Sequence, residues 1–167
     1  MRLTSACRLV ALAIALVPAA GFSQTPAKPD TVWGLLSEML TQPLEQESIN
    51  RLMGVEPDNF SPESFGMQAN WAEKSFADGV RVKPSLITWN NGKGTDVHMP
   101  ISGRCIKLKE VEANYPETKL IALPTHAYPE AVMSYTAGYS RGKVAFYTNA
   151  HTRCLSTVKI IPDASHR

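Results

Sequence analysis

The chain has 167 residues, with 17 lysines and arginines against 15 aspartates and glutamates. This length suits a single domain with its own hydrophobic core. The formal net charge of +2 gives little support to nucleic-acid binding, which depends on a strongly basic surface.

The first 23 residues have the pattern of a secretory signal peptide. Arg2 and Arg8 lie before or beside an apolar run at positions 9–17, and small residues follow Pro18. The run is shorter than the roughly 20 residues that span a bilayer. We therefore expect cleavage after residue 23 or two positions earlier, a periplasmic or secreted bacterial protein, and no transmembrane segment after cleavage. Loss of the two arginines leaves 15 basic and 15 acidic residues.

The cysteines of the mature chain predict one disulfide. Cys7 lies in the signal peptide, which leaves Cys105 and Cys154. Two thiols that enter an oxidising compartment usually pair. They lack the C-x-x-C spacing of a metal site. We expect a Cys105–Cys154 bridge and neither a metal centre, nor a cofactor, nor a catalytic cysteine.

The two ends of the mature chain differ in charge. Residues 24–79 contain three basic and nine acidic side chains, whereas residues 80–167 contain twelve basic and six acidic ones. Two interpretations remain open. The asymmetry steers a charged partner toward one face, or the two surfaces are solvated and partly neutralise each other in the fold.

Two helices are predicted near the start of the domain. Residues 24–30 contain two prolines and no apolar period, so we expect a flexible leader before a single domain at 31–163 and a tail at 164–167. An apolar stripe at helical spacing predicts a helix over 31–40, capped by Asp30 or Thr31. A second short helix at 45–53 begins with acidic residues and ends at Gly54.

The second half of the chain has the apolar period of two that is typical of strands. We expect residues 59–78 to form a loop, and Asn90-Asn91-Gly92 to form a hairpin turn. Strands are predicted at 80–89 with a break at Pro84, 95–101, 104–111, 119–123, 132–137, 143–148 and 154–161. The predicted fold class is α+β, with two or three N-terminal helices packed on an antiparallel sheet of about six or seven strands.

The segment TQPLEQESINRLMGVEP at 41–57 resembles the entry segment of small periplasmic modules built from two helices and a sheet. These are typified by the outer-membrane assembly lipoprotein BamE and the β-lactamase inhibitor protein BLIP. The similar features are a Thr followed by an acidic residue, apolar residues at helical spacing, and Leu-x-Gly followed by Pro. The chain departs from the BamE pattern by lacking the lipid-bearing Cys. The resemblance implies a role as an inhibitor, an immunity protein or an envelope-assembly factor.

Residues 138–142 read GYSRG and match the G-x-S-x-G pattern of serine hydrolases. In those enzymes the serine stands between a strand and a helix. Here a strand is predicted directly after Ser140, and the later Asp163 and His166 lie at the chain end, where residues usually fray. We therefore interpret 138–142 as a hairpin turn and assign no catalytic residue.

Other chemistry-bearing side chains have weak patterns. Glu110 and Glu112 are predicted on one face of a strand, the arrangement of an acid–base pair. His98 and His126 lack zinc-site spacing, although His98 beside Met99 is a candidate for a soft metal. Two carboxylates on one strand more often lie on a solvent-exposed face than in an active site. Glu110, Glu112, His98 and His126 therefore support only an alternative function. That alternative is a small secreted hydrolase of cell-wall or carbohydrate substrates.

Aromatic and arginine side chains provide a different indication. Trp, Tyr and Arg are the usual anchors of protein interfaces. The candidate interface residues lie at the two predicted hairpin tips and are Tyr139, Arg141, Trp89, Asn91 and Gly92. The leading hypothesis is an exported envelope protein, not an enzyme, that binds another protein through its sheet or hairpin tips. A third hypothesis is a binder of small apolar molecules inside a curved sheet.

Overall fold

The computed structural model describes residues 29–63, 66–89, 95–123 and 131–163. The predicted signal peptide, most of the leader, the Asn90-Asn91-Gly92 turn, His126 and the tail lie outside these residues. The helices are α1 (Val32–Thr41), α2 (Gln46–Met53) and α3 (Leu108–Asn114). The strands are β1 (Asn59–Glu63), β2 (Gly66–Asn70), β3 (Lys74–Ser75), β4 (Val80–Val82), β5 (Ser85–Trp89), β6 (Thr95–Gly103), β7 (Lys119–Ala122), β8 (Val132–Tyr139), β9 (Gly142–Asn149) and β10 (Leu155–Pro162).

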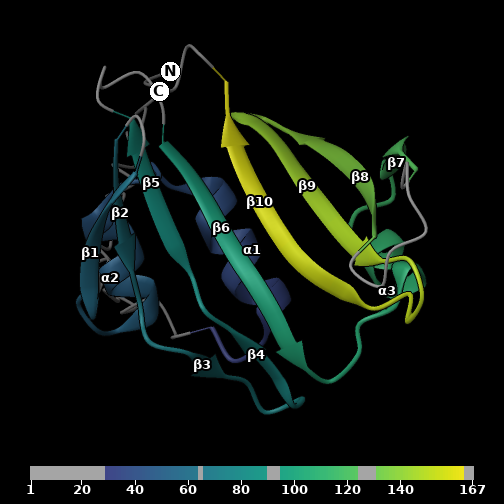
Figure 1. The fold of residues 1–167 in the computed structure, drawn as a ribbon, viewed down its shortest axis with the longest axis horizontal. Helices are drawn as coiled ribbons and strands as arrows, with labels where there is room; N and C mark the ends of the chain where they lie inside the picture. The colour runs from purple at the N-terminus through teal and green to yellow at the C-terminus, as the bar shows by residue number, and fades with distance from the viewer. Residues whose placement is uncertain (1–28, 64–65, 90–94, 124–130, 164–167) are drawn as a thin grey trace, which may run out of the picture.

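The strands form one antiparallel sheet in the order β1-β2-β5-β6-β10-β9-β8-β7, and β4 extends it by pairing with both β3 and β6. Figure 1 shows that the sheet curves around α1, which lies behind β6 and β10. Helix α2 lies behind the β1–β2 end and α3 lies near β8 and β9 at the other end. The α+β class and the antiparallel sheet are confirmed, and the sheet has more strands than predicted.

The two N-terminal helices form where the sequence predicts them. The hydroxyl of Thr31 accepts a hydrogen bond of 3.1 Å from the N–H of Gly34, which satisfies one of the donors left open at the start of α1. Gly54 ends α2 in the left-handed region, at φ 75°, which a glycine adopts without steric cost. The apolar stripes of both helices are buried and consist of Val32, Leu35, Leu36, Met39, Leu40, Ile49, Leu52 and Met53.

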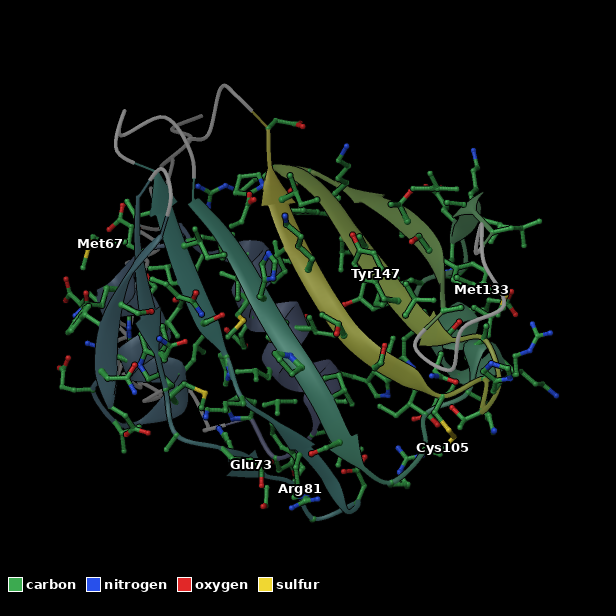
Figure 2. The ribbon with its side chains drawn as sticks, viewed as in Figure 1. Met67, Glu73, Arg81, Cys105, Met133 and Tyr147 are labelled. Carbon is green, nitrogen blue, oxygen red and sulfur yellow. A yellow bond between two sulfur atoms is a disulfide. The ribbon has the colours of Figure 1, made fainter. Side chains whose placement is uncertain are left out.

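Alternation along the strands separates an inner face, which packs on the helices, from an outer face. Val97 and Met99 of β6 lie opposite Ile160 and Val158 of β10, and all four are fully buried on the inner face. The residues between them point outward. Figure 2 shows Tyr147 of β9 on this outer face. The core therefore lies between the inner face of the sheet and the helices.

The predicted loop at 59–78 is wrong, because β1, β2 and β3 lie within it. The register places Phe60 opposite Ala69 on the inner face, while Ser61 and Gln68 pair on the outer face. A period of two was therefore present in these residues. It was obscured because the apolar positions at this end of the sheet are few and partly exposed.

The predicted strand at 104–111 is also wrong, because α3 begins at Leu108. Leu108, Val111 and Tyr115 follow at spacings of three and four, and they pack against the core from one side of the helix. Tertiary packing thus overrides the alternation of the first residues of the segment. The predicted disulfide between Cys105 and Cys154 is confirmed; it joins the chain before α3 to the start of β10, at the margin of the sheet (Figure 2).

Candidate functional site

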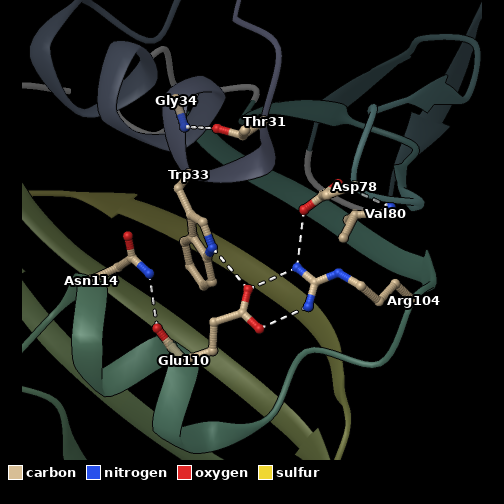
Figure 3. Close-up of polar contacts among 8 residues, drawn as sticks. All are labelled: Thr31, Trp33, Gly34, Asp78, Val80, Arg104, Glu110 and Asn114. Carbon is tan, nitrogen blue, oxygen red and sulfur yellow. Dashed lines mark hydrogen bonds and ion pairs between the residues drawn. The ribbon is translucent and has the colours of Figure 1, made fainter.

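The side chains of Trp33, Glu110, Arg104 and Asp78 form one polar network between α1, α3 and the chain before β4 (Figure 3). Arg104 donates two hydrogen bonds of 2.8 Å to the carboxylate of Glu110 and one of 3.0 Å to Asp78. The indole Nε1 of Trp33 donates to the same Glu110 carboxylate at 3.1 Å. The network therefore fixes the position of the Trp33 ring relative to α3.

The electrostatics of the network keep Glu110 and Arg104 charged. Hydrogen bonds from Arg104 lower the pKa of Glu110 below its usual value, and the bond from Trp33 acts in the same direction. Hydrogen bonds to Glu110 and then to Asp78 raise the pKa of Arg104. Glu110 is thus an ionised partner of an arginine, and it does not have the raised pKa that a general acid needs near neutral pH.

An aromatic cluster continues from Trp33 into the core. The ring centroid of Tyr115 lies 6.1 Å from that of Trp33 and 5.1 Å from that of the fully buried Phe146. These are the distances of favourable tilted aromatic pairs. Burial raises the pKa of Tyr115 to about 12, so its hydroxyl stays protonated at neutral pH.

An open groove of about 340 Å³ lies beside this cluster. It is bounded by α1, by the end of α3 and by the turn between β8 and β9. Its lining residues are Trp33, Ser37, Leu40, Thr41, Asn114, Tyr115, Tyr139 and Ser140. Three of these eight side chains are aromatic and none carries a charge at neutral pH.

The β8–β9 hairpin supplies one wall of the groove. Tyr139 pairs with Gly142, so Ser140 and Arg141 form a two-residue turn, which confirms the predicted hairpin. Strand β9 begins directly after this turn, and a nucleophile elbow would have a helix there. Tyr139 is partly buried, and burial raises its pKa. Tyr139 and Ser140 both line the groove beside α1.

The structure separates the candidate acid–base residues. Glu110 and Glu112 lie on α3 and not on a strand, and Glu112 is exposed while Glu110 binds Arg104. His98 of β6 points to the outer face, opposite Lys159 in the register, whereas Met99 is buried on the inner face. The predicted soft-metal pair is therefore divided between two faces. Among the described residues, no three His, Cys, Asp or Glu side chains gather as a metal site.

An ion pair lies on the outer face in the middle of the sheet. Lys159 contacts Asp96 at 3.2 Å, and Asp96 is largely buried. Trp89 is the last residue of β5, next to the Asn91-Gly92 turn, which the structure does not describe. The predicted interface at that turn therefore stays a prediction.

Edge strand β7 exposes an apolar surface. All four of its residues are exposed, and the accessible fractions of Leu120 and Ile121 are 51% and 61%. Leu123 follows with 65%, and Val132 at the start of the neighbouring β8 has 38%. Among the strands that the structure describes, β7 pairs with β8 alone and is the last in the order of the sheet. Its other edge thus faces away from the sheet, with large apolar side chains around it.

Comparison with protein-family models, curated proteins and solved structures finds no match to this chain. The resemblance to BamE-like and BLIP-like modules stays a prediction. Among the described residues, none of the helices is long and apolar enough to cross a membrane. Sequence reasoning missed Trp33 and Tyr115, which are central to the groove. Trp33 directly follows the first residue of the α1 stripe, and that position is the signal that could have revealed it.

Proposed function

We propose that this is an exported bacterial envelope protein that binds another protein by pairing an extended segment of that partner with β7. The observation that carries the proposal is the exposure of apolar side chains at this edge of the sheet. Edge strands carry backbone N–H and C=O groups that are open to pairing, and natural proteins usually protect them. Recognition by strand addition uses such an edge: backbone hydrogen bonds supply affinity and alternate side chains supply specificity.

The opposite edge of the sheet is less suited to strand addition. Strand β1 contains Pro62, which lacks a backbone N–H and is a common device for blunting an edge. Its exposed Phe60 lines a groove of about 270 Å³ together with Met67 of β2 and residues at the start of α2. The apolar side chains Phe60 and Met67 therefore line a groove beside α2. All four residues of β7, in contrast, are exposed.

Charge defines the expected partner further. Strand β7 begins with the exposed Lys119, and residues 80–167 contain twelve basic and six acidic side chains. A complementary segment is apolar at alternate positions and has acidic residues beside them. Tyr139 and Arg141 stay candidate interface residues, since Tyr and Arg are frequent anchors.

The partner would decide between two roles. The resemblance at residues 41–57 supports an inhibitor or immunity protein that blocks an enzyme, or an accessory factor in envelope assembly. Capture of an enzyme that loses its activity when it binds this protein would support the first role. Recovery of outer-membrane assembly components supports the second.

The test is affinity capture from the envelope extract of the source cell with mature protein, followed by mass spectrometry. We expect a specific protein to bind the wild type and to be lost with Ile121→Lys, because a charge in the middle of β7 prevents apolar contact. Val55→Lys is the matched control, since Val55 has a similar exposed fraction of 50% but lies between α2 and β1. Equal capture by wild type and both variants, with all three folded, would contradict the proposal.

A further inference from the structure

We propose that the groove between α1, α3 and the β8–β9 turn is a binding site for a neutral sugar ring. The inference is independent of β7, which lies outside the groove lining. It rests on three properties of the lining: aromatic rings that are held in place, hydroxyl and amide groups around them, and the absence of charge among the lining residues.

The aromatic part of the groove is preorganised. Glu110 holds the Trp33 indole through its Nε1, and Tyr115 packs between Trp33 and the buried Phe146. Tyr139 faces the same groove from the hairpin. The flat apolar faces of such rings suit the C–H faces of a pyranose. Because the rings are already fixed, binding costs little side-chain entropy.

The polar part of the groove offers hydrogen-bond acceptors and donors at its rim. The hydroxyl of Thr41 donates to the carbonyl of Glu38 at 2.9 Å, so its oxygen remains able to accept. The amide Nδ2 of Asn114 donates to the carbonyl of Glu110 at 2.9 Å, which leaves Oδ1 as an acceptor. Ser37 and Ser140 add hydroxyl groups that both donate and accept. A ligand rich in hydroxyl groups complements this set.

The absence of charge narrows the class of ligand. Recognition of phosphate or carboxylate normally uses Arg or Lys, and neither lines the groove. Glu110, the carboxylate behind Trp33, is neutralised by Arg104. The volume of about 340 Å³ lies at the lower end of the range for small-molecule sites, which corresponds to about one or two sugar rings.

The experiment is a titration of isotope-labelled mature protein with the neutral trisaccharides N,N′,N″-triacetylchitotriose and maltotriose, followed by NMR. We expect millimolar or tighter binding of at least one, with shifts of the Trp33 indole N–H and of the Ser140 amide. Tyr139→Ala should weaken binding about tenfold, because it removes one aromatic wall. Tyr139→Phe, which keeps the ring, should restore most of the affinity.

The matched control is Tyr147→Ala, which removes a tyrosine from the outer face of the same hairpin and should leave the affinity unchanged. Ile121→Lys should also leave it unchanged, so failure of the β7 proposal and failure of this one are distinguishable. Absence of binding of both trisaccharides at 20 mM would overturn the proposal. Shifts confined to residues outside the groove, or tighter binding of an acidic trisaccharide or a tyrosine-containing peptide at the groove, would also overturn it.

Discussion

The indole of Trp33 donates a hydrogen bond of 3.1 Å to the carboxylate of Glu110, 77 positions later in the chain. Because Glu110 also receives two hydrogen bonds from Arg104, this single carboxylate joins α1 to α3 and to the segment after β6. The groove beside Trp33 depends on that junction. The stability that the contacts of Glu110 contribute is therefore the first property to measure.

Replacement of Glu110 by Ala should lower the stability of the protein modestly. The Arg104 and Glu110 side chains are each about a third exposed, so solvent screening limits the contribution of the pair. We expect a loss of about 1 kcal/mol, which corresponds to a fall in Tm of about 3–5 °C. The matched control is Glu112→Ala on the exposed side of the same helix, with a change close to zero. Thermal unfolding measures both, and equal Tm values for the two variants would contradict the role of the network.

The contribution of Glu110 should depend on pH. Its pKa is lowered in the folded protein, chiefly by Arg104, from a usual value of 4.5. A lowered folded-state pKa stabilises the protein above the unfolded-state pKa, and this stabilisation is lost as the pH falls through the folded-state value. The stability difference between wild type and Glu110→Gln should therefore be complete at pH 7 and shrink below about pH 4.5. Urea unfolding at a series of pH values measures it. A difference that grows on acidification would refute the assignment.

Loss of the disulfide should destabilise the protein strongly. Cys105 and Cys154 are 49 positions apart, and a loop of this length stabilises by about 4 kcal/mol in the chain-entropy model. The Cys105→Ser, Cys154→Ser double variant should lose most of this free energy of unfolding in urea. A thiol assay on the unfolded mature protein should detect two thiols only after reduction. Two reactive thiols without reductant would show that the cysteines are unpaired.

Two glycines of the β8–β9 hairpin should differ strongly in their response to replacement by Ala. At Gly142, φ is +153° and a Cβ would collide with the backbone carbonyl of Ile161 and lie 2.8 Å from the Cα of Pro162. We expect Gly142→Ala to cost about 2 kcal/mol or more, because backbone must move. At Gly138 a Cβ meets no atom within 4 Å, so Gly138→Ala should change stability by less than about 0.5 kcal/mol. Similar urea midpoints for the two variants would show that β10 does not approach the hairpin so closely.

Local patterns predicted a large part of the fold. The stripe of α1, the Gly54 stop of α2 and the β8–β9 hairpin follow from spacing and turn chemistry, and the structure confirms them. Cysteine count alone predicted the Cys105–Cys154 bridge. The helices and the hairpin depend on a few residues that are close in sequence, and the bridge depends on covalent pairing of two cysteines. Long-range packing is not needed to specify them.

The groove could not be predicted in the same way. Its walls come from α1, α3 and the hairpin. The alternation of residues 104–111 predicts a strand, whereas in the structure Val111 is buried as part of helix α3. Without α3, the sequence gives no reason to bring Tyr115 beside Trp33. The exposure of Leu120 and Ile121 was equally hidden, because an apolar strand looks the same in sequence at an edge or in the middle of a sheet.

The most direct test of the proposed function is hydrogen exchange of the β7 backbone amides, measured for the mature protein alone and with its captured partner. Strand addition predicts that exchange at β7 slows at least tenfold on binding, because amides at the open edge form hydrogen bonds with the partner. The residues around Val55 should exchange at the same rate in both states. Unchanged exchange at β7, with protection confined to other surfaces, would contradict the proposal.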